Sequence, residues 1–196
     1  MEQLIECMKR LFATNYQYYV KAHGFHVNVV GPDFVQYHQL FGEVYKFADE
    51  ASDSIPEHIR VMQAIAPFSL KRIMELGSIE DGKERPEALR MVKDLLADSQ
   101  ILMDHYEECH DMAVEEKCYG LINFIEGQMD ELGKKILRLR LGERGISIEM
   151  EHSHRMTDRI PGSGFCNPTG ESGSSQGPDA APGRNPPGRI HLTGGR

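Results

Sequence analysis

The stretch KAHGFHVNVVGPDFVQYHQLFGEVYKFADEASDSIPEHIR, residues 21–60, is the starting point for interpreting this chain. It contains two histidines, His26 and His38, and two carboxylates four positions apart, Asp53 and Glu57. Two imidazoles and two carboxylates form a mixed nitrogen and oxygen ligand set, which suits iron or zinc. The stretch therefore predicts a metal site, provided that the four side chains can meet in space.

Hydrophobic periodicity predicts an all-α chain with four long helices. Apolar residues recur at intervals of three and four, which is the period of one helical face, and no segment alternates with the period of a strand. The expected helices cover residues 2–29, 34–63, 86–114 and 118–141. The gap between the first two is short, so we expect these helices to be antiparallel neighbours.

The long connection lies between the second and third helices. Within it, Ser69 can cap a short helix over residues 70–76, and Gly77 can close that helix. A four-helix bundle with one long crossover is the ferritin-like arrangement. Farther along the chain, Gly142 and Gly145 are expected to end the fourth helix.

Composition divides the chain near residue 146. The net charge of −8 falls entirely on residues 1–146, because five basic and five acidic residues cancel in the rest of the chain. Such an acidic surface repels nucleic acid and anionic membranes and attracts cations. Fifteen of the last 50 residues are glycine or proline. We therefore expect a folded domain over residues 1–146 and a disordered tail over residues 147–196.

The four cysteines, Cys7, Cys109, Cys118 and Cys166, form no CxxC pair. In a chain of this length, that usage is typical of reduced thiols in a cytosolic protein. The N-terminal residues carry charges where a signal peptide needs an apolar core, and no apolar run is long enough to span a membrane. We therefore expect a cytoplasmic protein without a membrane partner.

The four candidate ligands cannot bind one ion within one straight helix. His38 and Asp53 are 15 residues apart on the same predicted helix, which corresponds to about 22 Å, whereas metal–ligand bonds are about 2 Å long. His26 can approach His38, because the two flank the turn by similar distances. The ligands therefore form two half-sites, and antiparallel packing of two copies in a two-fold dimer would complete two identical sites.

Each candidate ligand also has a plainer interpretation. A single histidine on a half-apolar helical face is more often a packed or capping residue than a ligand, and an Asp/Glu pair four positions apart is more often a solvated face. His23, three residues before His26, is an alternative ligand or an exposed side chain. Spacing alone does not decide among these interpretations.

The same stretch resembles the signature of the Dps family, the mini-ferritins named as DNA-binding proteins from starved cells. The matching motifs are AHxFHxN at residues 22–28, GPxF at residues 31–34, His38 with Phe41 and Tyr45, and DxIxE at residues 53–57. The similarity continues more loosely, so that it covers residues 1–144 in all.

The resemblance implies a homo-oligomer, a dodecameric hollow shell of four-helix subunits built from two-fold dimers. Such a shell stores ferric oxide and consumes hydrogen peroxide while oxidising Fe(II), so the implied activity is that of a ferroxidase that binds iron. By matching position, His26 and His38 would be iron ligands from one subunit, and Asp53 and Glu57 would be iron ligands from its partner.

The sequence departs from the family pattern at three places. Gly42 stands where the family usually has Asp or Glu, and this loss should weaken the second iron position. Val27 stands where the family usually has tryptophan, which this chain lacks; Tyr37 and Tyr45 are candidates for its role as a local electron donor. Pro56 lies between the two carboxylates and should bend the helix there.

Two other functions stay open, the first of them because of Gly42 and Pro56. One is a structural or DNA-protecting shell protein with a weakened ferroxidase centre, and the other is a metal-storage or cargo shell whose tail recruits a partner. DNA binding in the family usually depends on extensions rich in lysine and arginine. The tail has no lysine, and its last arginines, Arg184, Arg189 and Arg196, make only a faint basic end. We therefore do not expect DNA binding.

Overall fold

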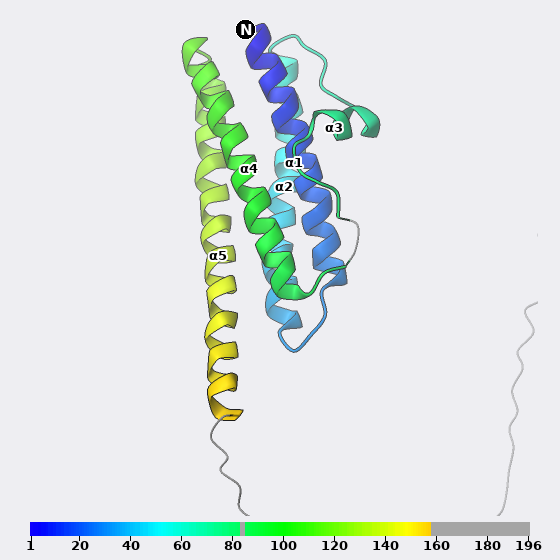
Figure 1. Cartoon of the computed structure of the whole chain (residues 1–196). Coiled ribbons are helices and arrows are strands. Elements are labelled where there is room, and N and C mark those ends of the chain that lie inside the picture. The colour runs from blue at the N-terminus through cyan, green and yellow to red at the C-terminus, as the bar shows by residue number, and fades with distance from the viewer. Residues whose placement is uncertain (83–84, 158–196) are drawn as a thin grey trace, which may run out of the picture. The chain divides into compact units, whose positions relative to one another are not determined.

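A computed structural model of the chain describes residues 1–82 and 85–157, and these residues form helices and no strand. The elements are α1 (Glu2–Asn28), α2 (Phe34–Val61), α3 (Leu70–Leu76), α4 (Ala88–Glu115) and α5 (Tyr119–Thr157). The long helix α1 packs on α2 and α4, and α5 packs on α4 and α2 (Figure 1). The predicted all-α bundle with one long crossover that carries a short helix is confirmed.

The inward face of each long helix builds one apolar core. Its largest fully buried side chains are Tyr18, Tyr106, Phe41, Leu4, Met8, Leu11, Ile55, Ile59, Met91, Leu95, Leu102 and Ile125. Burying one such aliphatic side chain contributes about 1.5–3 kcal/mol, so this core supplies most of the drive for folding. One core phenol has a buried polar partner: the Tyr18 and Ser99 hydroxyls are 2.6 Å apart.

A tight turn brings the end of α1 beside the start of α2. Gly31 has φ +125°, a conformation that favours glycine. Its carbonyl accepts a hydrogen bond of 3.2 Å from the Phe34 amide. The two helices run antiparallel from this turn, so residues that flank it at similar distances lie at one end of the helix pair (Figure 1).

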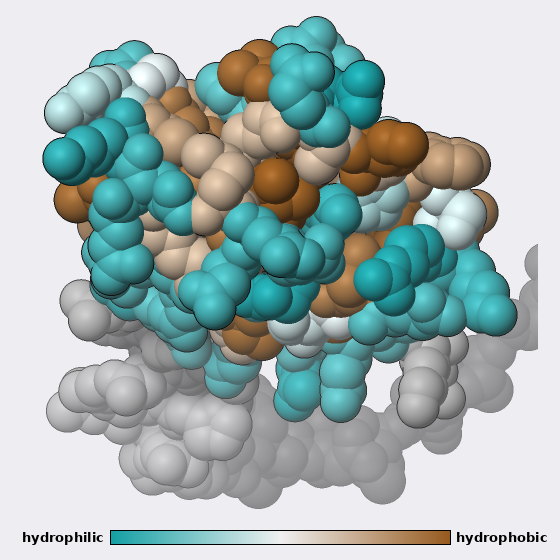
Figure 2. Space-filling view, turned by 90° about the horizontal axis from the view of Figure 1, so that it is seen from above, coloured by the Kyte–Doolittle hydropathy of each residue, from teal (hydrophilic) through white to brown (hydrophobic). Residues whose placement is uncertain are grey.

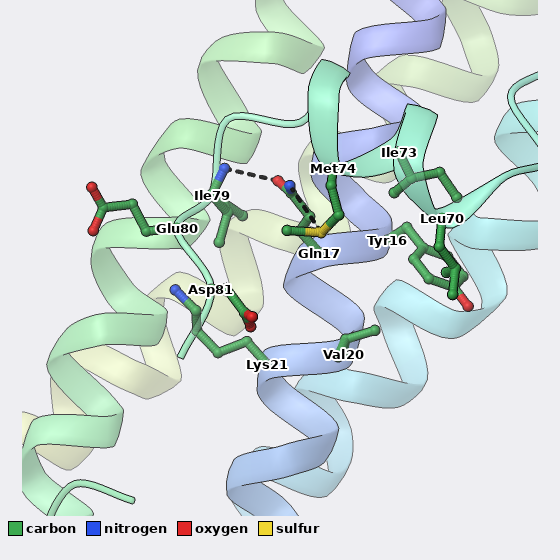
Figure 3. A pocket seen from close by; sticks show the side chains of 10 residues that line it. All are labelled: Tyr16, Gln17, Val20, Lys21, Leu70, Ile73, Met74, Ile79, Glu80 and Asp81. Atoms are coloured by element: carbon green, nitrogen blue, oxygen red, sulfur yellow. Dashed lines mark hydrogen bonds between the residues drawn. The ribbon is translucent and has the colours of Figure 1, made fainter. Parts of the chain in front are cut away.

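Two side chains of α1, Gln17 and Thr14, hold the crossover between α2 and α4 against that helix. Gln17 Oε1 accepts a hydrogen bond of 2.9 Å from the Ile79 amide, and its Nε2 lies 3.8 Å from Met74 Sδ (Figure 3). Ser69 caps α3 as predicted, because its side chain accepts a hydrogen bond of 3.2 Å from the Arg72 amide. These contacts fix residues 69–79 of the crossover against α1.

Gly77 follows α3 because Gln17 occupies the space that a side chain would need. A Cβ built at residue 77 would overlap the Gln17 amide group. We expect Gly77→Ala to displace Gln17 and to lower the free energy of unfolding by about 1–3 kcal/mol, the usual cost of overpacking. Urea denaturation measures this change, and Gly127→Ala is the control because nothing lies within 4 Å of a Cβ at residue 127. Equal stability of the Gly77 variant and the wild type would contradict the expectation.

The predicted end of the last helix is wrong. α5 continues through Gly142 and Gly145 to Thr157. A glycine inside a helix costs about 1 kcal/mol relative to alanine, so two glycines weaken a helix without stopping it. Gly142 also allows a close approach, since its Cβ would lie 3.4 Å from Leu40 Cδ2.

Residues 147–157 therefore belong to α5, and the rest of the predicted tail lies outside the described residues. Although α5 has 39 residues, neither it nor another helix in the described part of the chain is apolar enough to cross a membrane.

The expectation of reduced thiols is wrong for two of the four cysteines. Cys7 on α1 and Cys109 on α4 form a disulfide with their Cα atoms 5.7 Å apart. Both are fully buried where the two helices face each other, which sequence spacing could not reveal because 102 positions separate them. Cys118 is free, and Cys166 lies outside the described residues.

Candidate metal centre

The two histidines flanking the turn are brought together. The His26 and His38 rings stack with their centroids 3.7 Å apart. His26 Nδ1 is 2.7 Å from the backbone carbonyl of His38, and His38 Nδ1 is 2.8 Å from the backbone carbonyl of His26. This reciprocal pair of hydrogen bonds ties the last turn of α1 to the first turns of α2.

These bonds decide which ring nitrogens are available to a metal. A carbonyl oxygen only accepts, so Nδ1 must donate in both rings. In the neutral imidazole, the lone pair then remains on Nε2 of His26 and of His38. A second hydrogen bond that fixes the tautomer and orientation of a metal-binding histidine is a general feature of metal sites. The donor set therefore fits a metal ion that prefers imidazole nitrogen.

Gly42 lies directly beneath one of these rings. A Cβ at residue 42 would lie 3.3 Å from both Cε1 and Nδ1 of His26. The His26 ring has little freedom to withdraw, because it stacks on His38 and is hydrogen-bonded to it. Glycine at residue 42 therefore has two consequences. It removes one expected ligand, and it leaves room for the His26 imidazole.

We expect Gly42→Ala to reduce the affinity of the histidine pair for Zn(II) or Fe(II) by about 10-fold. This is the lower end of the loss in metal affinity that follows when the hydrogen bonds orienting a ligand are disturbed. Folding stability should change little, because alanine favours the helix by about 1 kcal/mol and offsets part of the crowding. Calorimetric titration with Zn(II) measures the affinity. Unchanged affinity in the alanine variant would show that the ring does not depend on the space at residue 42.

The two carboxylates lie on α2, away from the histidines. Asp53 and Glu57 are both exposed, and α2 continues through Pro56 to Val61. Among the side chains that the structure describes, those of residues 1–82 and 85–143, no three His, Cys, Asp or Glu groups are placed so that they could hold a metal ion. One chain therefore brings His26 and His38 together and leaves the carboxylates apart from them.

A third histidine stands next to the carboxylates without joining them. The His58 ring packs on Phe124 of α5 with the centroids 4.2 Å apart. Burial lowers the pKa of His58, and the charge of Glu57 opposes this change only in part. His58 is therefore neutral at pH 7 and has a packing role between α2 and α5.

Aromatic neighbours of the histidine pair were only partly anticipated from the sequence. The Tyr45 ring lies 4.9 Å from that of His26 and 4.8 Å from that of His23. Tyr37, the other candidate, is buried and stacks on Phe41. The helical spacing of Tyr45 and His38, seven positions apart, could have favoured Tyr45, since such residues share a helical face.

Comparison with known proteins agrees with this architecture. Residues 5–141 match the family model of the ferritin-like domain. Antigen TpF1 of Treponema pallidum (strain Nichols) is 30% identical over 125 residues, which are 62% of this chain and 69% of the antigen. The DNA protection during starvation protein 2 of Bacillus anthracis is 25% identical over 139 residues, which are 71% and 95% of the two chains.

Among solved structures, the Dps protein from Bacillus brevis superimposes with a TM-score of 0.69 and 25% identity, covering 71% of this chain and 94% of that one. The fold and the family model define the class as ferritin-like. The chain belongs to the Dps family of ferritin-like proteins, as its signature stretch predicted.

Proposed function

We propose that the chain is an iron-oxidising, iron-storing mini-ferritin that works as a homo-oligomer. His26 and His38 of one subunit and Asp53 and Glu57 of its two-fold partner would bind Fe(II) as the substrate. The observation that carries this proposal is the histidine pair, in which both Nδ1 atoms bond to carbonyls and both Nε2 atoms are left for a metal.

The reaction we propose is the oxidation of Fe(II) by hydrogen peroxide. Two Fe(II) ions give one electron each, and peroxide with two protons becomes two waters. The carboxylates would supply the hard oxygen ligands that stabilise the Fe(III) product, while the imidazoles would hold the incoming Fe(II). The ferric product would be mineralised in the acidic interior of a dodecameric shell in the cytoplasm.

An apolar face on α1 and α3 supports assembly through a two-fold dimer. Val20 and Leu70 are 49% and 68% exposed, and both line a pocket of about 220 Å³ (Figure 3). Viewed from above, large hydrophobic groups lie among the hydrophilic ones (Figure 2). Exposed apolar side chains that lie together on two elements suit contact with a second copy. A second copy packed there in the antiparallel sense would bring its carboxylates to the histidine pair.

Mixing the metal-free full-length protein with Fe(II) and limiting peroxide tests this function. We expect Fe(II) oxidation faster than in buffer, with two Fe(III) formed per peroxide. Native mass spectrometry of the same sample reports the oligomer. Oxidation no faster than in buffer, with an intact assembly, would refute the proposed activity.

A structural or DNA-protecting shell remains the second candidate, because Gly42 removes one expected carboxylate. The net charge of −8 opposes contact with DNA phosphates. A salt-sensitive gel shift that is lost when residues 147–196 are deleted would favour this candidate over the ferroxidase.

A further inference from the structure

A row of aromatic rings covers the face of α1 and α2 beside the histidine pair. The centroid of the Tyr45 ring lies 4.9 Å from that of His26 and 6.4 Å from that of Tyr19. The Tyr19 ring in turn lies 5.9 Å from that of Tyr16. All three tyrosines are half-buried. They form a continuous series of phenols that begins at a proposed iron ligand.

The far end of this row points along α1 toward the carboxylate half-site. Tyr16 is ten residues from His26 along α1, which corresponds to about 15 Å. Its neighbour Asn15 donates a hydrogen bond of 2.9 Å to Ser52 Oγ on α2, and Ser52 directly precedes Asp53. The row therefore covers most of the interval between the histidine half-site and the carboxylate half-site of one chain, which belong to two different iron sites.

The proposed reaction has a need that this row can meet. Peroxide takes two electrons, whereas each Fe(II) gives one. Gly42 brings no ligand to the site, so under the proposed function a second iron would be held only weakly there. The chain has seven tyrosines and no tryptophan. Tyr45 is the phenol whose ring lies beside His26, so it is placed to give the second electron.

We infer, on the basis of the proposed function, that Tyr45, Tyr19 and Tyr16 form a one-electron relay connecting the two iron sites of a dimer. At one site, Fe(II) and Tyr45 each give one electron to hydrogen peroxide. The phenol proton and one solvent proton complete two waters, and Fe(III) and a Tyr45 phenoxyl radical remain.

The radical then moves away from the histidines. An electron passes from Tyr19 to Tyr45 and then from Tyr16 to Tyr19, each phenol exchanging its proton with its surroundings. Fe(II) at the second site gives one electron to the Tyr16 radical, and a proton restores the phenol. The sum is two Fe(II) oxidised and one peroxide reduced to two waters, with each iron at a different site.

The surroundings of the middle phenol suit this role. Partial burial and the negative charge of Asp49 raise the pKa of Tyr19, so the phenol keeps its proton at neutral pH until an electron leaves. The His23 ring stacks on Tyr19 at 5.9 Å and lies 4.8 Å from the Tyr45 ring. His23 therefore fixes the positions of two relay rings.

Freeze-quench electron paramagnetic resonance on the full-length assembly tests the relay. The protein is loaded with one Fe(II) per chain and mixed with peroxide, and hydroxyl radical is measured in parallel with a spin trap. We expect a transient tyrosyl radical in the wild type. Tyr45→Phe keeps the ring packing but cannot lose a phenol proton, so the radical should disappear and trapped hydroxyl radical should rise several-fold. Tyr119→Phe, at the exposed Tyr119 of α5, is the control and should behave as the wild type.

The outcomes separate the relay from the proposed function. Fe(II) oxidation at the wild-type rate without a tyrosyl radical, and with no change in Tyr45→Phe, would overturn the relay and leave the ferroxidase activity standing. Absence of accelerated Fe(II) oxidation in the wild type would overturn both. Equal loss of the radical in Tyr45→Phe and Tyr119→Phe would also overturn the relay. Zn(II) affinity equal to the wild type in Tyr45→Phe confirms that its histidine pair is intact.

Discussion

Fe(II) oxidation in the double variant His26→Ala, His38→Ala is expected to be at least about 100-fold slower than in the wild type. Removing only a residue that hydrogen-bonds to a metal ligand already lowers metal affinity or activity by about 10–100-fold, and this variant removes two ligands. The substitutions remove both imidazole donors and the reciprocal hydrogen bonds between them. The helices should persist, since alanine is the most favourable helix residue. Stopped-flow absorbance of the Fe(III) product measures the rate.

Two further variants make this result specific. His110→Ala is the matched control, because His110 has no proposed role in binding iron. It lies on α4, and its Nε2 is 3.2 Å from Glu126 Oε1 on α5. His23→Ala tests the alternative ligand that the sequence left open. A double variant that oxidises Fe(II) as fast as His110→Ala would remove the histidine pair from the mechanism. A loss of Zn(II) affinity in His23→Ala, as large as in the double variant, would assign the ligand role to His23.

Removing the disulfide Cys7–Cys109 is expected to lower the free energy of unfolding by about 4–5 kcal/mol, because it closes a loop of about 100 residues. The bond joins the first third of α1 to the last third of α4, and it therefore ties the two halves of the bundle together. Urea denaturation of Cys7→Ala, Cys109→Ala against the wild type measures the loss.

The alanine variant also loses the packing of two sulfur atoms, so the wild type should be compared in oxidised and fully reduced forms as well. Cys118→Ala, at the free cysteine, is the control. A difference below about 1 kcal/mol between oxidised and reduced protein would show that the packing of α1 on α4, rather than the cross-link, holds these helices together.

The helices were predictable because each carries a strong local signal. The apolar stripes of α1 and α2, the Ser69 cap and the tight turn after α1 depend on residues close together in the sequence. The continuation of α5 past Gly142 was not predictable from those rules, because a glycine near an expected helix end has the same appearance whether it ends the helix or allows contact with Leu40. The disulfide was missed because it joins residues 102 positions apart.

The candidate site was predictable in its residue types and not in its details. The rise per residue alone separated His38 from Asp53. The reciprocal hydrogen bonds, the space that Gly42 leaves for His26 and the ring contacts of Tyr45 depend on how α1 faces α2. Such contacts between two helices are set by packing, which hydrophobic periodicity does not specify.

The central claim is that each iron site is built from two chains, and complementation between two inactive variants tests it most directly. One variant is His26→Ala, His38→Ala, and the other is Asp53→Ala, Glu57→Ala. Each is expected to assemble and to be inactive alone. A mixed dimer of the two has one site with all four ligands and one site with none.

Random mixing of the two unfolded variants in equal amounts, followed by joint refolding, should therefore restore Fe(II) oxidation to at most about a quarter of the wild-type rate, because half of the dimers are mixed and each has one intact site of two. The proposed relay has no second iron in these dimers, so the rate should stay below this ceiling. Native mass spectrometry confirms that mixed assemblies have formed. Fe(II) oxidation faster than in either variant alone, up to that ceiling, is the predicted result. No recovery in mixed assemblies, or full activity of either variant alone, would contradict a site shared between two chains.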